Sequence, residues 1–321
     1  MESNLINLEE KILPIDQNPA AVYISSLSEG SKRSQFEALK KIALFISNGE
    51  ISDVLAIPWH LIRYQHAQAI RAGLINKGLS YKTINRHLTA LRRVLLEASR
   101  LGLMSSEDYH RAADVPNVKG ETLPAGRHIT AGEIKALFNV CINDNSPSGY
   151  RDAAILGLLA GCGLRRAEVV VLDLADYDEL TGQLKITGKR NKQRLAYLTN
   201  GAADALNDWL AIRGKGEGAL FMAINKGGKI QPGRLTDQSV YDMLLRRAIQ
   251  AGIESLSPHD LRRTFIGELL DAGADIATVS FLAGHQDVNT TAKYDRRPEQ
   301  AKRKAAELLH VPYIKRLGLN K

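Results

Sequence analysis

The chain has 321 residues, 44% of them hydrophobic, which is typical of two folded domains and excludes wholesale disorder. Its 43 lysines and arginines exceed its 35 aspartates and glutamates by 8, so a polyanionic partner such as nucleic acid is favoured. No signal peptide opens the chain and no apolar run approaches the roughly 20 residues that span a bilayer, so we expect a cytoplasmic protein without a membrane partner. The two cysteines, Cys141 and Cys162, have no metal-ligand spacing, so no metal site is expected.

The first part of the chain predicts an all-helical domain over residues 19–113, preceded by an N-terminal arm, residues 1–18. The arm is either loose or a short helix. Helices are expected over 19–27, over 31–47, from Pro58 to Gly78, and after Ser80. The last is the clearest, because Ser80 is a suitable N-cap and apolar residues recur in steps of three and four from position 84 to 98.

Basic side chains lie off the apolar stripes of these helices. A charged helix face is often merely solvated. Several such faces in one small domain of a basic protein nevertheless favour DNA binding, because helices fit the major groove and basic side chains contact phosphates. The predicted DNA contacts of this domain are Lys32, Arg33, Lys40, Lys41, Lys82, Asn85, Arg86 and Arg93.

Residues 114–128 predict a linker, because they contain two prolines and two glycines without apolar periodicity. A second domain, residues 129–300, then begins with the capping-box spacing of Thr130 and Glu133. Residues 301–321 form a separate C-terminal segment with a helical pattern to about His310.

The second domain alternates helices with a predicted β-hairpin. An apolar helix ends at residues 161–163, and Arg165 starts the next element with Glu168 three residues later, a spacing that indicates helix capping or an ion pair. Residues 183–199 alternate apolar and polar around a basic turn, as in a hairpin. The glycine-rich residues 224–233 are expected to form a loop, since they lack the spacing of a phosphate-binding loop.

The stretch from Pro258 to Tyr294 contains the largest group of candidate site residues. A helix starting at Ser257-Pro258 would place His259 and Arg262 on one face at an N-terminus that favours anions. His285 and Tyr294 follow in polar surroundings. These residues predict a phosphate-binding cluster with a tyrosine within reach, whereas each of them alone is an ordinary surface residue.

Five motifs follow one another in this domain: GLRRAE, TGKRNKQR, PHDLRRT, AGH and TTAKYDRR. In this order they resemble the tyrosine recombinase (phage integrase) family, including Xer-type recombinases and compact integrases of phages and mobile elements. The resemblance implies a mainly α fold with a small antiparallel β-sheet in the C-terminal domain. It also implies a two-domain DNA clamp whose first domain is a core-binding, SAM-like module.

The resemblance further implies the catalytic residues, with Tyr294 as nucleophile. A tyrosine with a pKa of about 10 needs help to lose its proton, and two arginines can clamp the charged phosphate oxygens of the transition state. No metal is then required, because the arginines supply the charge stabilisation that a divalent ion gives in many nucleases. No nucleotide cofactor is required either, since the phosphotyrosyl link preserves the energy of the phosphodiester. The predicted catalytic set is Arg165, Lys189, His259, Arg262, His285 and Tyr294, with Lys192 and Arg194 as further DNA contacts.

The expected activity is site-specific recombination of double-stranded DNA through a 3′-phosphotyrosyl intermediate, which integrates, excises or resolves DNA. Two alternatives stay open: relaxation of the type IB topoisomerase kind, and a DNA-binding regulator without catalysis. The resemblance implies a bacterial, nucleoid-associated protein that is monomeric when free and forms a homotetramer on two sites. Residues 301–321 pack either on a neighbouring protomer or on their own domain.

Overall fold

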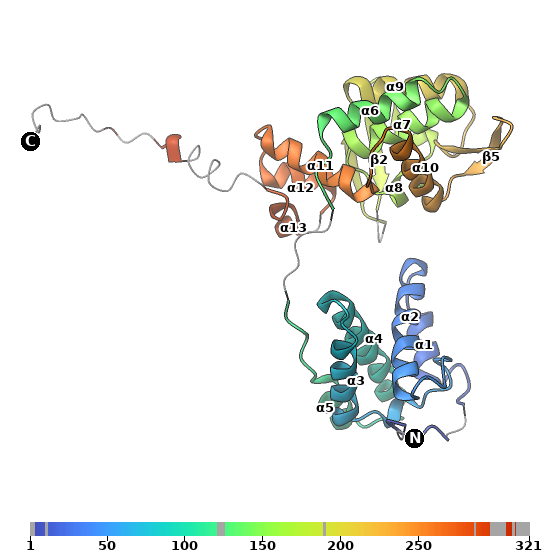
Figure 1. The fold of residues 1–321 in the computed structure, drawn as a ribbon, viewed down its shortest axis with the longest axis vertical. Helices are drawn as coiled ribbons and strands as arrows, with labels where there is room; N and C mark the ends of the chain where they lie inside the picture. The colour runs from blue at the N-terminus through green and yellow to red at the C-terminus, as the bar shows by residue number, and fades with distance from the viewer. Residues whose placement is uncertain are drawn as a thin grey trace, which may run out of the picture. The chain divides into compact units, whose positions relative to one another are not determined.

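The computed structural model describes residues 4–9, 12–120, 126–188, 191–285, 287–295, 306–309 and 312. The chain divides into two compact units, Met1–Thr122 and Leu123–Lys321, and Figure 1 shows the elements of each. Unit 1 is helical, and unit 2 combines helices with two small antiparallel sheets, which confirms the predicted mainly α class. The division falls inside the predicted linker 114–128; the remaining predicted boundaries stay predictions.

Unit 1 is organised around helix α4, which contacts every other helix of the unit. Ser80 caps it by accepting a hydrogen bond from the Thr83 backbone N–H, as its sequence predicts. Its apolar stripe, including Leu88, Leu91 and Leu95, is buried in the core of the unit. The elements of unit 1 are α1 (Pro19–Ser25), α2 (Glu29–Ile46), a 3₁₀ turn η1 (Trp59–Leu61), α3 (Tyr64–Asn76), α4 (Tyr81–Arg100) and α5 (Ser106–Ala113).

The helix predicted from Pro58 to Gly78 is wrong in its first third. Residues 59–61 form the separate turn η1, and α3 starts only at Tyr64. The interruption has a tertiary cause, because Trp59 is fully buried and its indole N–H donates to the Val54 carbonyl at 2.8 Å. Between η1 and α3, the backbone of Ile62 and Arg63 is extended, with ψ of 129° and 174°, so the two helical segments are separate.

Both ends of unit 1 are fastened to its core. In the predicted arm 1–18, Ile6 is buried and the Leu5 backbone N–H donates to the Ile46 carbonyl. At the other end, Asn85 of α4 exchanges two hydrogen bonds with the backbone of Val118, at 2.8 and 3.0 Å. Arg92 of α4 donates to the carbonyls of Ala113 and Val115. The beginning of the predicted linker is therefore fixed along α4.

Unit 2 is built around the apolar helix α7, which packs against α6, α8, α9 and α11. The capping box of Thr130 and Glu133 at the start of α6 is confirmed. The helices are α6 (Ala131–Ile142), α7 (Pro147–Gly161), α8 (Arg166–Val171), α9 (Asn200–Arg213), α10 (Asp237–Gln250), α11 (Pro258–Asp271), α12 (Ile276–Ala283) and α13 (Val288–Ala292), with a 3₁₀ turn η2 (Leu174–Asp176). In Figure 1, α11, α12 and α13 lie together at one end of the unit.

The predicted hairpin forms the main sheet of unit 2. Strand β2 (Gln183–Thr187) lies between β1 (Tyr177–Asp178) and β3 (Gln193–Tyr197), and all pairings are antiparallel. The register pairs Thr187 with Gln193, and the Gly188 N–H donates to the Lys192 carbonyl across the turn. The β2–β3 hairpin is confirmed.

The loop predicted for residues 224–233 is instead most of a second hairpin. Strands β4 (Met222–Ile224) and β5 (Ile230–Arg234) pair antiparallel. The Asn225 side chain organises the turn, because its oxygen accepts from the backbone N–H groups of Gly227 and Lys229 at 3.0 Å. The glycines and Pro232 suggested a loop, but a side-chain turn and an edge strand that tolerates proline account for them equally well.

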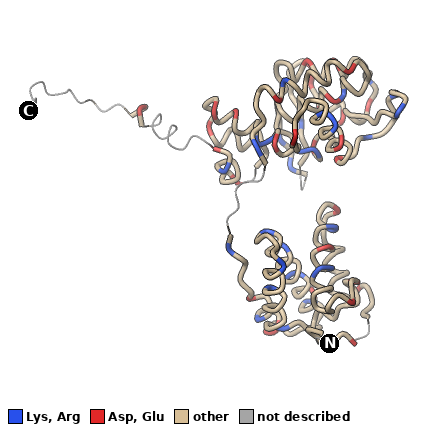
Figure 2. Tube along the Cα trace, in the orientation of Figure 1, with Lys and Arg blue, Asp and Glu red and all other residues tan. Residues whose placement is uncertain are grey.

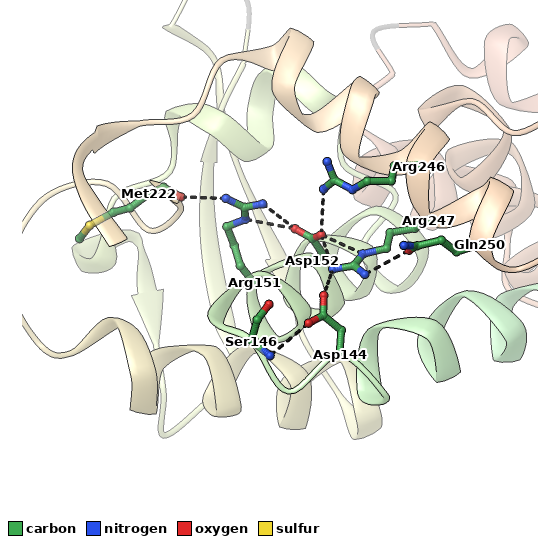
Figure 3. Close-up of polar contacts among 8 residues, drawn as sticks. All are labelled: Asp144, Ser146, Arg151, Asp152, Met222, Arg246, Arg247 and Gln250. Atoms are coloured by element: carbon green, nitrogen blue, oxygen red, sulfur yellow. Dashed lines mark hydrogen bonds and ion pairs between the residues drawn. The ribbon is translucent and has the colours of Figure 1, made fainter. Parts of the chain in front are cut away.

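A buried ionic network fastens α10 to α7 (Figure 3). Asp152 of α7 is fully buried and accepts hydrogen bonds from the side chains of Arg151 and Arg247. Arg247 of α10 also donates to Asp144, which lies between α6 and α7, at 2.6 Å. A buried carboxylate is tolerated only when it is paired, so removal of Arg247 would weaken the pairing of Asp152, which would keep Arg151 and Arg246.

Candidate active site

The first turn of α11 carries two predicted site residues and is held by reciprocal capping. Ser257 and Asp260 form a capping box, and Pro258 occupies the first turn, as the sequence predicts. The second carboxylate oxygen of Asp260 accepts from the backbone N–H of Arg127 at 2.9 Å. These contacts fix the start of the helix, and with it His259 and Arg262.

Arg262 is anchored in the interior of unit 2. Its side chain donates to the Gly163 carbonyl at 2.6 Å and to the Ala283 carbonyl, and the residue is 3% exposed. Burial and the nearby charge of Arg165 lower the pKa of Arg262 to about 10. The guanidinium therefore stays cationic at neutral pH in a fixed orientation.

Arg165 precedes α8 and is held by Glu168, which confirms the predicted helix cap and ion pair. The Glu168 carboxylate accepts from the Arg165 backbone N–H at 2.9 Å and from its guanidinium at 2.8 Å. Glu168 is almost fully buried, which opposes its ionisation, but contacts with Arg194 and Arg165 outweigh burial and lower its pKa to about 2. The Arg165 side chain itself remains 45% exposed, so it is accessible to an anion.

Three consecutive carbonyls at the end of α12 each accept from a different arginine. Leu282 accepts from Arg194, Ala283 from Arg262 and Gly284 from Arg165. Cations at a helix C-terminus stabilise its unpaired carbonyls. We call these residues, 282–284, the carbonyl row. It joins β3, α8 and α11 to the segment immediately before His285.

His285 and Tyr294 lie beside each other after the carbonyl row. The His285 ring stacks on the Tyr294 ring, with centroids 6.1 Å apart and an angle of 19° between the planes. Its Nδ1 lies 2.8 Å from the hydroxyl of Thr291, a buried residue of α13. Burial and the neighbouring Arg262 and Arg165 lower the pKa of His285 to about 4, so its ring is neutral at pH 7.

The hydroxyl of Tyr294 lies 3.2 Å from Nε2 of His259. Burial and the charge of Arg262 lower the pKa of His259, which favours the neutral ring that can accept a proton. The Arg263 guanidinium lies 5.9 Å from the Tyr294 ring centroid, within cation–π range. The structure thus brings together five predicted residues from α11 and from the segments beside α8, α12 and α13: Arg165, His259, Arg262, His285 and Tyr294. Lys189, the sixth predicted residue, lies outside the described residues.

The predicted DNA contacts differ in how far their side chains are available. Lys and Arg positions recur along the helices of unit 1 in Figure 2. Arg33 and Lys41 of α2 and Lys82, Arg86 and Arg93 of α4 are exposed, as is Lys192 of the β2–β3 turn. Lys32 and Lys40 are partly exposed, and Lys32 pairs with Glu29.

Two of the predicted DNA contacts also have partners within the chain. The Asn85 amide is committed to the Val118 backbone. The Arg194 guanidinium is bound to Glu168 and Leu282 and is 14% exposed. Both were predicted from charge or polarity at a solvent-facing position, a pattern that cannot reveal a partner distant in sequence.

Within the described part of the chain, no group of three His, Cys, Asp or Glu side chains could hold a metal ion. The two cysteines are buried, and burial raises the pKa of each thiol to about 12. Among the same residues, no helix is long and apolar enough to cross a membrane.

The site is a cationic cluster of Arg165 and Arg262 beside a tyrosine whose hydroxyl lies 3.2 Å from a histidine nitrogen. Residues 127–300 match the model of the phage integrase family. The chain belongs to this family, the tyrosine recombinases, which are DNA strand-transferring enzymes.

Curated relatives support this assignment over most of the chain. The chain is 34% identical to the tyrosine recombinase XerC of Alcanivorax borkumensis over 244 residues, 74% of this chain and 76% of the relative. It is 32% identical to XerC of Actinobacillus pleuropneumoniae, with 76% of this chain and 78% of the relative covered.

Solved structures share the fold at low sequence identity. The XerH site-specific recombinase bound to a palindromic difH substrate has a TM-score of 0.66 at 20% identity, covering 95% of this chain and 99% of that one. The Tn1549 transposon integrase in complex with transposon right-end DNA has a TM-score of 0.65 at 18% identity, covering 92% and 99%. Each of these two recombinases is bound to DNA in its own structure.

Proposed function

We propose that this enzyme recombines double-stranded DNA at specific sites, with Tyr294 as the nucleophile. The observation that carries the proposal is the pairing of the Tyr294 hydroxyl with His259 Nε2 at 3.2 Å. A general base must lie within hydrogen-bond reach of the proton that it takes, and a neutral imidazole is a suitable acceptor. The pairing gives the tyrosine a route to its nucleophilic form.

The proposed cleavage step forms one bond and breaks one. The Tyr294 oxygen attacks the phosphorus as its proton passes to His259, and the bond from phosphorus to the 5′ oxygen breaks. Arg165 and Arg262 stabilise the negative charge on the non-bridging oxygens, with His285 as a further hydrogen-bond donor. Lys189, assigned from its place in the TGK motif that resembles the family's, gives a proton to the leaving 5′ oxygen. The product is a 3′-phosphotyrosyl enzyme and a free 5′ hydroxyl.

The second half of the reaction reverses these roles with a new strand. A 5′ hydroxyl from the partner duplex attacks the phosphotyrosine, so the phosphodiester re-forms without an external energy source. Two guanidiniums supply the charge stabilisation that a divalent ion gives in many nucleases, so the reaction needs no cofactor. Exchange between two duplexes requires four active sites, and we therefore propose a homotetramer on two DNA sites that assembles from monomers.

The exposed lysine and arginine side chains of α2 and α4 are proposed to contact the DNA backbone. Lys192 is proposed as a further contact from the β2–β3 turn. Such contacts make affinity fall with salt without specifying sequence. With DNA as the substrate, we propose a bacterial, nucleoid-associated location. The residues that would test packing of 301–321 on a neighbouring protomer lie mostly outside the described residues.

A two-duplex assay tests the proposal. The recombination site is first selected from random duplexes by binding, and two labelled duplexes carrying it are then incubated with the enzyme. Recombinant joint molecules are expected. Relaxation of a supercoiled plasmid without joint molecules would instead indicate a topoisomerase-like activity and would contradict the proposal.

A further inference from the structure

We propose that Arg194 is a positioning residue of the strand-transfer reaction, which orients Arg165 through Glu168 and holds the turn before His285. The inference rests on the proposed function, because it assigns a role within that reaction. Its starting observation is that a basic residue of the β2–β3 hairpin points into the domain instead of toward solvent, with only 14% of its side chain exposed.

Every nitrogen of the Arg194 guanidinium has a partner within the domain. Nη1 and Nη2 donate to the two Glu168 oxygens at 3.0 and 2.9 Å, and Nε donates to the Leu282 carbonyl at 3.2 Å. Such a two-pronged pairing fixes the plane of a carboxylate, which a lysine ammonium cannot do. Arg194 therefore determines the orientation of Glu168.

Glu168 transmits this orientation to Arg165. Its two oxygens also accept from the backbone N–H and the guanidinium of Arg165, at 2.9 and 2.8 Å. Without Arg194, the Glu168 carboxylate would keep only its hydrogen bonds from Arg165, the residue that it orients. Because Glu168 is nearly fully buried, it would then rotate or take up a proton, and either change would release Arg165.

The second contact of Arg194 reaches the other side of the site. Gly284 has a left-handed backbone, with φ of +65°, and a Cβ built there would come within 2.9 Å of Arg194 Nη1. The guanidinium therefore packs directly on the turn that leads into His285. Arg194 therefore links β3 to Glu168, which holds Arg165, and to the carbonyl row, which leads into His285.

The charges around Glu168 set the expected pH behaviour. Glu168 faces Arg165 at the start of α8 and Arg194 of β3, and Arg262 of α11 lies within electrostatic range. Arg194 and Arg165 keep the carboxylate ionised against the effect of burial. Loss of Arg194 should therefore raise the pKa of Glu168 and add a fall in cleavage rate on the acidic side.

The test compares Arg194→Met with Arg194→Lys and with Arg247→Met. Arg247 is the matched control because it is equally committed to carboxylates, of which Asp152 is fully buried, yet it belongs to the α10 network of Figure 3. Three quantities are measured: the first-order rate of covalent complex formation at saturating DNA, the affinity for DNA over a range of salt, and the folded fraction.

For Arg194→Met we expect a cleavage rate roughly 100-fold lower, the effect of a misplacement of about 1 Å. We also expect unchanged DNA affinity and salt dependence and a new acidic limb in the pH–rate profile. The cleavage rate of Arg194→Lys should lie between those of the wild type and Arg194→Met. Arg247→Met should lower thermal stability while its folded molecules cleave at the wild-type rate.

Two results would overturn the positioning role while the wild-type enzyme still cleaves. One is loss of affinity and salt dependence in Arg194→Met with an unchanged rate at saturation, which would identify a phosphate contact. The other is a rate that falls only with the folded fraction, as in Arg247→Met. Absence of any covalent complex with the wild-type enzyme would overturn the proposed function, and the positioning role with it.

Discussion

The Tyr294 hydroxyl and His259 Nε2 lie 3.2 Å apart although 35 residues separate them in the chain. One belongs to the first turn of α11 and the other follows α13, and α12 lies between these helices in sequence. Both come from the same chain, so the proposed nucleophile and its proton acceptor meet in cis.

The pairing makes cleavage dependent on the protonation of His259. The pKa of His259 is lowered by burial and by Arg262, so the neutral acceptor predominates at pH 7 and is lost as pH falls through that pKa. We therefore expect the cleavage rate of the wild-type enzyme to fall at acidic pH. We expect His259→Gln to cleave roughly 10²- to 10⁴-fold more slowly and to lack the part of the acidic fall that depends on His259. Single-turnover cleavage between pH 5 and 8 measures this; an identical acidic fall in the variant would refute it.

Arg262 has both a structural and a chemical role. In Arg262→Lys, one nitrogen on a differently shaped side chain replaces the two nitrogens that donate to the carbonyls of Gly163 and Ala283. We expect destabilisation by about 1–3 kcal/mol from the unpaired buried carbonyl, and cleavage slower by roughly 10²- to 10³-fold. Arg166→Lys is the control, since Arg166 is partly exposed and pairs with Asp237. Chemical denaturation and single-turnover cleavage measure the two effects, and equal behaviour of both variants would be contrary evidence.

Alanine substitutions at Gly284 and Gly252 distinguish the effect of backbone strain from the effect of a contact with Arg194. Both have left-handed φ angles, +65° and +70°, but a Cβ at 284 would meet Arg194, whereas a Cβ at 252 would meet nothing within 4 Å. Each alanine should destabilise the fold by about 1–2 kcal/mol through its φ angle. Gly284→Ala alone should also slow cleavage per folded molecule. Cleavage slowed equally in both variants would argue against the contact.

The buried ring of His87 should make the folded protein less stable in acid. Its ring is buried in α4, Nδ1 lies 2.6 Å from the Thr83 carbonyl, and Nε2 has no hydrogen-bond partner. Burial and the charges of Arg86 and Lys41 lower its pKa below the unfolded value of about 6.5, so protons bind the unfolded chain more readily.

Stability should therefore decrease as pH falls below about 6.5, by about 1.4 kcal/mol at most for each unit of pKa difference. His87→Leu should lose this part of the pH dependence. Urea unfolding at pH 7.5 and pH 5 measures both. An unchanged difference between the two pH values in His87→Leu would exclude His87 as its source.

Local sequence signals predicted the elements of the site well. Ser257-Pro258 marked the start of α11, Thr130 and Glu133 marked α6, and the alternation around Gly188 marked the β2–β3 hairpin. Each depends on residues within a few positions of one another. Such signals are legible because capping and turn formation are local interactions.

The errors have the opposite origin. Trp59 interrupts a predicted helix because its side chain is fully buried in the core of unit 1. Asn85 and Arg194 stay predicted DNA contacts, but their partners within the chain lie 33 and 26 residues away, and the sequence did not reveal them. A charge or amide at a helical or strand position does not show whether its partner is solvent, DNA or a distant carboxylate, so such roles emerge only from the fold.

The most direct test of the central claim is covalent trapping on a nicked suicide duplex that carries the selected site. The wild-type enzyme should form a DNA adduct that survives denaturation, with the phosphate on the peptide containing Tyr294. Tyr294→Phe should bind the duplex with unchanged affinity and form no adduct. An adduct formed by Tyr294→Phe at the wild-type rate would show that another residue is the nucleophile.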